Sequence, residues 1–201
     1  MIRIKKDLAM TIDLNKDINV IQNSEGVEKH LKPYKELLGD DYEGYRGHIY
    51  RILTYTLHFL GGESQYRKAI EAAFVYHDIG LWTDGKLNYL APSAKRAREA
   101  LKSEFNAEEM EIIDGIIMWH HKITPYKKGQ NADVIDAARK ADWIDASMGM
   151  VKKGMPKGHI NKVQSLIANN GFHQTLKEFG PRLRGWNIFL MIWEMQGIMK
   201  L

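Results

Sequence analysis

The chain has 201 residues, 44% of them hydrophobic and 27% charged, which is enough for one globular domain with a sizeable core. It contains no cysteine, so disulfides and thiolate metal sites are excluded, and only His, Asp or Glu could hold a metal ion. The net charge of +4 is mild and the basic residues are scattered, which argues against a nucleic-acid-binding protein and is compatible with an anionic small substrate.

Residues 1–26 are expected to form an N-terminal extension ahead of a single helical domain over residues 27–201. Alternation of polar and apolar residues in the extension is weak and confined to residues 2–21. Its first residues lack a long apolar core and mix acids with bases, unlike a secretory signal. No apolar run is long enough to cross a bilayer, so we expect a cytoplasmic protein without a membrane partner.

After the extension, apolar residues recur at the spacing of amphipathic helices. The glycines at 61–62 can end the first of these helices, Ser64 can cap the second, and Gly80 can end it. Asn106 and Glu109 have the spacing of a capping box at the start of the fourth helix. The helices predicted in this part of the chain cover 43–60, 64–80, 93–103, 107–121 and 131–148.

Three further helices are predicted in the C-terminal part, near 159–169, 172–179 and 181–199. Pro181 suits the first turn of the last one. That helix is apolar nearly all round, which indicates either a central core helix or a subunit contact, for example in a homodimer. The chain is therefore predicted to be all-α, with its helices in a compact bundle.

The stretch "FVYHDIGLW", residues 74–82, places His77 and Asp78 side by side at the end of an apolar helix. An adjacent His–Asp pair is weak evidence alone, and a capped helix end with one hydrogen-bonded histidine would explain it. His48, however, also lies beside the apolar stripe of its own helix, where a polar group needs a partner to offset the cost of desolvation.

Two further sets of ionisable residues lie on predicted helices. His120 and His121 end an apolar helix, and at least one of them is expected to face inward, while Asp142 and Asp145 share one helical face. Taken singly, each of these residues is more often structural than functional. Together with the previous ones they place inward-facing ionisable groups on four helices, and buried charges are tolerated chiefly when they are paired or bound to a metal.

A divalent cation would be one common partner for these groups. Two imidazoles and two carboxylates suit Mn²⁺, Fe²⁺, Co²⁺, Ni²⁺ or Zn²⁺, whereas Mg²⁺ prefers oxygen ligands. Four protein ligands on a six-coordinate ion would leave positions for water and substrate. The composition of the set therefore predicts a transition-metal site open to small molecules.

In chain order, His48, then His77 and Asp78 in "HDIG", then Asp142 in "KADWID", resemble the HD-domain superfamily of metal-dependent phosphohydrolases. The likeness covers a motif-bearing core of about 44–150. It implies an all-α fold in which these four residues hold the metal ion. It also implies hydrolysis of a small phosphoester, such as a nucleotide, by metal-activated water.

Other residues could assist such a reaction. Arg51 and Lys122 could bind the phosphate of the substrate, although a surface ion pair and a solvated lysine are the simpler alternatives. Asp145 could orient a ligand histidine or Lys140, or it could bond a backbone amide. Five aromatic residues flank the predicted ligands and could stack on a base or simply fill the core. These are Tyr76, Trp82, Tyr89, Trp119 and Trp143.

The doubled histidine resembles family members that bind a second metal. Those members carry another histidine between the HD pair and the later ones, but this chain has none between residues 78 and 120. We therefore favour one tightly held ion, with His120 or His121 as a substrate contact, proton donor or outer ligand. The other histidines are interpreted as structural or surface residues. These are His30, His58, His159 and His173.

Two other classes of function remain open on the same residues. One is a different enzyme on the same scaffold, either an iron oxygenase of the HD type or a metal-dependent hydratase of a small molecule. The other is a non-catalytic module that binds a metal or nucleotide and regulates a partner. Metal content, phosphate release and oxygen consumption would separate the three.

Overall fold

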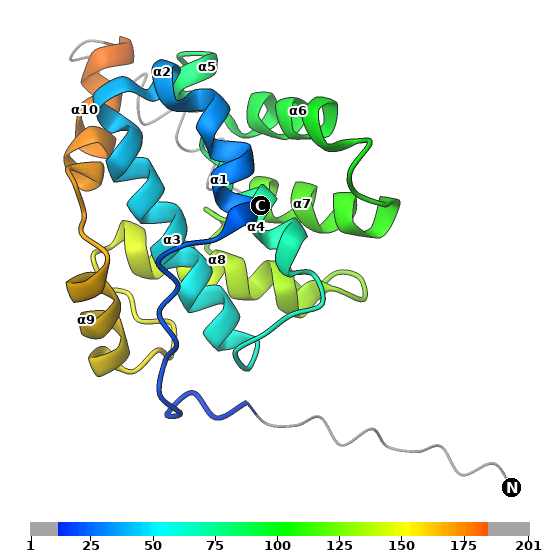
Figure 1. Ribbon diagram of the computed structural model, residues 1–201, viewed down its shortest axis with the longest axis vertical. Helices are drawn as coiled ribbons and strands as arrows, with labels where there is room; N and C mark the ends of the chain where they lie inside the picture. Colours follow the sequence, from blue (N-terminus) through cyan, green and yellow to red (C-terminus); the bar gives the residue numbers. More distant parts are fainter. Residues whose placement is uncertain (1–11, 185–201) are drawn as a thin grey trace, which may run out of the picture.

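The computed structural model describes residues 12–184, and this part of the chain is a bundle of helices without a strand (Figure 1). The prediction of an all-α fold is confirmed. No helix in these residues is long and apolar enough to span a membrane. The helices are α1 (Glu25–Leu31), α2 (Lys35–Leu38), α3 (Tyr42–Phe59), α4 (Arg67–Tyr76), α5 (Gly80–Thr83), α6 (Leu90–Leu101), α7 (Ala107–Trp119), α8 (Ala132–Ala146), α9 (Lys157–Leu166) and α10 (Phe172–Arg184).

Helix α3 is the centre of the bundle and is covered on almost every side. Of its 18 residues, 15 are buried. It packs against α4 and α8, and α7 packs in turn against α4, α6 and α8. In Figure 1, α6 and α7 lie on one side of α3, and α9 and α10 lie on the other. Polar side chains on α3, such as His48 and Arg51, must therefore find their partners inside the protein.

Two glycines of α3 allow the segment between α9 and α10 to pass close to it. A Cβ atom at Gly44 would lie 2.9 Å from the carbonyl oxygen of Asn170, and one at Gly47 would lie 2.8 Å from that of Ala168. Both distances are shorter than Cβ contacts in proteins, so a side chain at either position would displace this segment. The close approach brings Phe172, at the start of α10, onto the face of α3 that carries His48.

The helix predicted from Ser64 to Gly80 is shorter at both ends. The Ser64 hydroxyl does not cap the helix; it accepts a hydrogen bond from the backbone N–H of Tyr66 (3.2 Å) in a turn that precedes α4. At its other end α4 stops at Tyr76, and residues 77–79 form a turn. The His–Asp pair therefore lies in the turn between α4 and α5.

Gly80 begins α5, so the prediction that it ends the preceding helix is wrong. A Cβ atom here would lie 2.7 Å from the carbonyl oxygen of Tyr89 and 2.8 Å from the hydroxyl oxygen of Ser93. The Ser93 hydroxyl also accepts a hydrogen bond from the Gly80 N–H (2.9 Å). The glycine is needed for close packing of the HD turn against the start of α6, and this brings Tyr89 towards that turn.

The remaining predicted helices match the structure within a few residues at each end. The capping box at the start of α7 is confirmed, because the side chains of Asn106 and Glu109 each bond the other residue's backbone N–H at 3.0 Å. Pro181 does not start a separate helix; it lies inside α10. The rest of the predicted helix over 181–199, with its proposed subunit contact, falls outside the described residues from 185 onward.

The described part of the N-terminal extension lies along the bundle. The backbone N–H of Ile21 donates to the Thr54 hydroxyl on α3 (3.1 Å), and the His58 ring is within hydrogen-bond distance of the Leu14 carbonyl (3.0 Å). Ile18 is buried between these two contacts. Ile18 and Ile21 of this segment therefore belong to the hydrophobic core, and residues 1–11 lie outside the described part of the chain.

Candidate metal centre

The four residues predicted to bind a metal meet at one buried point. His48 comes from α3, His77 and Asp78 from the turn after α4, and Asp142 from α8, and all four are buried. The two histidine Nε2 atoms are 3.1 Å apart, and the His77 Nε2 lies 3.2 Å from Oδ2 of Asp78. Oδ1 of Asp142 lies 3.5 Å from the His48 Nε2 and 3.9 Å from the His77 Nε2. We call these four residues the first ligand group.

The hydrogen bonds of the two imidazoles determine which nitrogen carries the proton. Nδ1 of His77 is 2.6 Å from the carbonyl oxygen of Phe74, which can only accept, so Nδ1 carries the hydrogen. Nδ1 of His48 is 2.7 Å from Oδ2 of Asp145 and donates to that carboxylate. When both rings are neutral, as metal ligands must be, the two Nε2 atoms therefore present lone pairs to each other. Two facing lone pairs repel each other, and a cation between them would bind both nitrogens.

The spacing of these atoms is close to that of ligands around one ion. Neighbouring donors at about 2.1 Å from a metal lie about 3.0 Å apart in an octahedron and about 3.4 Å apart in a tetrahedron. The two Nε2 atoms lie 3.1 Å apart, and the His48 Nε2 lies 4.0 Å from Oδ2 of Asp78. Ligand atoms of His48, His77 and Asp78 all lie within 4.8 Å of one another, and Asp142 adds an oxygen 3.5 Å from the His48 Nε2.

The electrostatics of the cluster also call for a cation. Burial disfavours the charged form of His48, but hydrogen bonds and Coulombic attraction from Asp142 and Asp145 outweigh it and raise its pKa to about 9. Burial by itself would raise the pKa of Asp78 and Asp142. The surrounding imidazoles nevertheless hold the pKa of both carboxyls below its ordinary value. Without a metal ion, a proton on His48 supplies the positive charge that the carboxylates attract.

Asp145 holds His48 in place and is itself held by Arg51. The Arg51 Nε and Nη2 atoms donate to the two carboxylate oxygens of Asp145 at 2.6 and 2.9 Å, and Nη1 donates to the carbonyl of Ala168 at 2.9 Å. Of the alternatives predicted for Asp145, orientation of a ligand histidine is the one that fits, because Lys140 pairs with Asp136 instead (3.0 Å).

Arg51 is 1% exposed, so the predicted contact with a substrate phosphate does not fit its position. The predicted alternative of an ion pair on the helix surface does not fit either, because the pair with Asp145 is buried. The sequence could not show this, since the two residues are 94 positions apart. Arg51 neutralises the buried Asp145 and so keeps the acceptor for the His48 ring in place.

A second set of ligand atoms adjoins the first and shares Asp78. Suitable atoms of Asp78, His120 and His121 lie within 4.8 Å of one another, and we call these residues the second ligand group. The His120 Nδ1 donates to the Ile117 carbonyl (2.8 Å), so its Nε2 carries a lone pair, 3.3 Å from Oδ1 of Asp78. That Nε2 is buried and has no hydrogen-bond partner among the described residues. Burial and the neighbouring His121 lower the pKa of His120 to about 4, so this ring is neutral.

His121 lies at the edge of the cluster. Its Nδ1 is 3.5 Å from Oδ2 of Asp142, and its side chain is 28% exposed, whereas those of the first ligand group are almost completely buried. The loop that follows is tied to α8, because Arg139 and Trp143 both donate to the Lys122 carbonyl (3.3 and 3.2 Å). Partial burial lowers the pKa of the Lys122 ammonium. The prediction that one of the two histidines faces inward is confirmed for His120.

Sequence reasoning missed the contacts of several residues at this centre. Tyr89 was predicted only as an aromatic neighbour, but its hydroxyl donates to Oδ1 of Asp78 (2.7 Å) and contacts Nε2 of His121. Phe172 stacks on the His48 ring with centroids 4.1 Å apart. His173, interpreted as structural or surface, has Nε2 2.7 Å from the Asp145 carbonyl. Nothing local in the sequence indicates these three contacts. Tyr45 also adjoins the site, bonded to the Val75 carbonyl (2.9 Å), and it could have been found, because it lies one turn before His48 on the same helical face.

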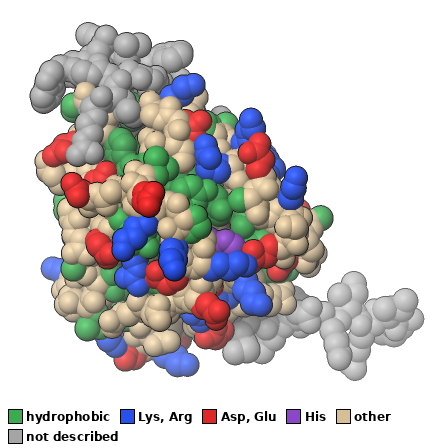
Figure 2. Space-filling model, turned by 45° about the horizontal axis from the view of Figure 1, so that its top comes forward, with side chains coloured by type: hydrophobic (Ala, Val, Ile, Leu, Met, Phe, Trp, Pro, Cys, Tyr) green, Lys and Arg blue, Asp and Glu red, His purple; other side chains and the backbone are tan. Residues whose placement is uncertain are grey.

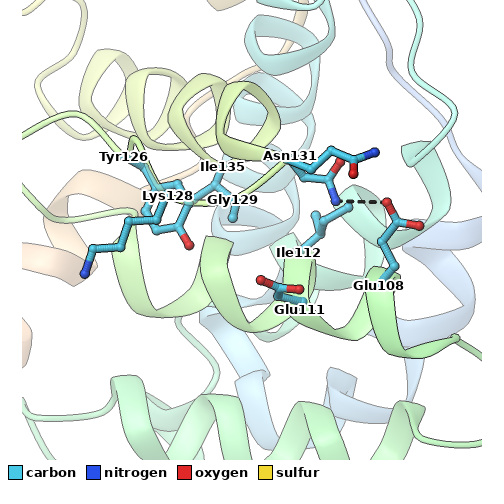
Figure 3. Close-up of a pocket in the computed structure, with 9 residues that line it drawn as sticks. Glu108, Glu111, Ile112, Tyr126, Lys128, Gly129, Asn131 and Ile135 are labelled. Carbon is cyan, nitrogen blue, oxygen red and sulfur yellow. Dashed lines mark hydrogen bonds between the residues drawn. The ribbon is translucent and has the colours of Figure 1, made fainter.

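A surface pocket of about 160 Å³ lies elsewhere, between α7 and the start of α8 (Figure 3). Glu108, Glu111 and Asn131 line it, and Asn131 donates to Glu108 (3.1 Å) across its edge. None of its lining residues belongs to either ligand group. The face drawn in Figure 2 mixes Lys and Arg with Asp and Glu, and one histidine reaches the surface there beside hydrophobic side chains.

No protein-family model, curated protein or solved structure matches the chain.

Proposed function

We propose that this protein is a metal-dependent phosphohydrolase of the HD-domain type that acts on a small phosphoester, with nucleotides as the first candidates. One observation carries the proposal. The Nε2 atoms of His48 and His77 face each other at 3.1 Å beside two buried carboxylates, and the residues occur in the order of the family pattern. A divalent cation accounts for this arrangement, and hydrolysis is the reaction that the resemblance implies.

The donor set fits a transition metal. His48, His77, Asp78 and Asp142 would hold Mn²⁺, Fe²⁺, Co²⁺, Ni²⁺ or Zn²⁺ through two nitrogens and two oxygens. When bound, such an ion lowers the pKa of a coordinated water and polarises a phosphoryl oxygen. Asp145 fixes the tautomer of His48, because it accepts the Nδ1 hydrogen and leaves Nε2 free for the metal.

Substrate would approach from the side of His121. Its side chain is the most exposed of the two ligand groups, so a phosphoester entering from solvent meets it before the buried imidazoles. His121 would contact the phosphate or donate a proton to the leaving group, and Lys122, next in the chain, would add positive charge. Within the proposal, Arg51 and Asp145 are positioning residues, and His120 remains an outer ligand or substrate contact.

The second ligand group favours a second candidate function. Asp78, His120 and His121 add two more imidazoles next to the first four ligands, and a site rich in histidine also suits iron chemistry. An iron oxygenase or a hydratase of the same fold would use the same ligands. A non-catalytic binding module would retain the metal without turnover.

The test is an activity screen on the full chain. Protein loaded separately with each of the five metals is incubated with nucleoside mono-, di- and triphosphates and with simple phosphomonoesters, and phosphate release is measured. We expect release with at least one metal, and its loss in His77→Ala and Asp142→Ala. The control is His159→Ala, which removes a histidine outside both ligand groups.

The alternatives give different outcomes. Oxygen consumption by the iron-loaded protein without phosphate release would favour the oxygenase. Metal retention without turnover of any substrate would favour a binding module. Failure to retain any of the five metals would overturn the proposed centre itself.

A further inference from the structure

Tyr89 brings a hydroxyl group from a loop into the second ligand group. It immediately precedes α6 and is 5% exposed. Its hydroxyl lies 2.7 Å from Oδ1 of Asp78 and within hydrogen-bond distance of Nε2 of His121. The close packing of Gly80 on the Tyr89 carbonyl keeps this loop against the HD turn. Packing of the Tyr89 backbone against Gly80 thus keeps the hydroxyl group at the centre.

These hydrogen bonds engage two of the three residues that a second cation would need. The hydroxyl donates its proton to Oδ1 of Asp78, the oxygen that also lies nearest to the His120 Nε2 (3.3 Å). The hydroxyl also contacts Nε2 of His121, the second residue of the group that it engages. The His120 Nε2 is left with a lone pair and no hydrogen-bond partner among the described residues.

The charges at the centre balance one divalent cation. Asp78 and Asp142 are the carboxylates that face the ligand nitrogens in the described part of the chain, while Asp145 is already paired with Arg51. Two negative charges neutralise one divalent ion. A second divalent ion therefore needs a further anion, such as a bound hydroxide or phosphate, as well as free ligand atoms.

We propose that the Tyr89 hydroxyl takes the place of a second cation, so that the centre holds a single metal ion. Tyr89 is then a positioning residue that sets the metal stoichiometry. It satisfies Oδ1 of Asp78 by a hydrogen bond and leaves Oδ2, on the side of His77, for the resident ion. This inference depends on the proposed function only in assuming that the first ligand group holds a metal.

The experiment is a titration of the metal-free protein with Mn²⁺, followed by calorimetry and by metal analysis after gel filtration. We expect one Mn²⁺ per chain in the wild type and two in Tyr89→Phe, because removal of the hydroxyl frees Asp78 and His121 to bind an ion together with His120. Tyr55→Phe is the matched control, since its hydroxyl is buried without a hydrogen-bond partner among the described residues. That variant is expected to bind one ion.

A double variant locates the additional ion. Tyr89→Phe combined with His120→Ala should lose the second Mn²⁺ and keep the first. Tyr89→Leu also removes the hydroxyl and provides the same comparison where Tyr89→Phe does not fold, as judged by circular dichroism.

Two ions in the wild type would overturn the inference, as would one or none in Tyr89→Phe, or two ions retained in the double variant. A wild-type protein that binds no ion at all would instead overturn the proposed function. The two failures are therefore distinguishable.

Discussion

The two ligand groups share Asp78 but differ in how firmly the protein holds them. In the first group, the ring N–H of His48 is bonded to Asp145, that of His77 is bonded to a backbone carbonyl, and both rings are buried. In the second, the His120 ring is also buried and bonded through Nδ1 to a backbone carbonyl, but its Nε2 lacks a hydrogen-bond partner among the described residues, and the side chain of His121 is 28% exposed. The first group is therefore suited to a resident ion, and the second to groups that change partners when a substrate binds.

The largest expected effect comes from removing a ligand of the first group. His77→Ala should abolish metal retention while the helical signal in circular dichroism survives, because the substitution removes one of two imidazole donors from a buried site. His121→Ala should retain the ion, because His121 belongs only to the second group. Metal content after gel filtration measures both. Equal metal content in His77→Ala and His121→Ala would show that the two ligand groups do not differ in how they hold the ion.

Loss of Arg51 should have the next largest effect. Arg51→Ala leaves the buried Asp145 with His48 but without its guanidinium partner, and breaking a buried pair costs about 3–5 kcal/mol of unfolding free energy. Urea denaturation of the metal-free protein measures this. Arg46→Ala is the control, because its pair with Glu28 is partly exposed and is worth up to about 1 kcal/mol. Equal losses in the two variants would show that the buried pair does not anchor the first group.

A smaller effect is expected when the charge behind His48 is removed but the shape is kept. Asp145→Asn can still accept the Nδ1 hydrogen of His48, but without the carboxylate the imidazole is a weaker ligand. Replacements of this kind lower metal affinity about 10- to 100-fold. Mn²⁺ calorimetry measures the change. Asp136→Asn, on the same helix but bonded to Arg139, should bind Mn²⁺ as the wild type does.

The smallest effect is a dependence on pH. Because neighbouring carboxylates raise the pKa of His48 to about 9, this ring carries a second proton, on Nε2, in the metal-free protein at neutral pH. A metal ligand must be unprotonated, so binding of the ion releases that proton, and affinity should rise about tenfold per pH unit between pH 7 and 8. Calorimetry in buffers of different ionisation enthalpy counts the released protons. No proton release would contradict the assignment of His48 as a ligand.

His48 and His77 of the first ligand group could be predicted to face inward from helical periodicity, whereas Asp78 and Asp142 are assigned as ligands through the family resemblance. His48 lies beside an apolar stripe on α3, and His77 continues the stripe of α4, so both were expected to face inward. The capping box of α7 was equally readable, since it depends on two residues three positions apart. Such patterns depend only on nearby residues, and the periodicity of a helix then predicts which side chains face the core.

The parts that could not be predicted depend on contacts between distant segments. The sequence alone indicates that Arg51 could bind phosphate, because its partner Asp145 lies 94 residues later in the chain. Tyr89 lies ahead of α6 in a segment without periodicity, so nothing in the sequence gives the direction of its hydroxyl. Gly80 was expected to end a helix, but it is a glycine because the Tyr89 backbone passes 2.7 Å from where its Cβ would be.

Metal analysis of the purified protein tests the central claim most directly. After removal of metal and separate reloading with Mn²⁺, Fe²⁺, Co²⁺, Ni²⁺ and Zn²⁺, we predict one tightly bound ion per chain for at least one of them. The same treatment of Asp142→Ala should leave none. A wild-type protein that retains no ion, or an Asp142→Ala variant that retains as much as the wild type, would contradict the account.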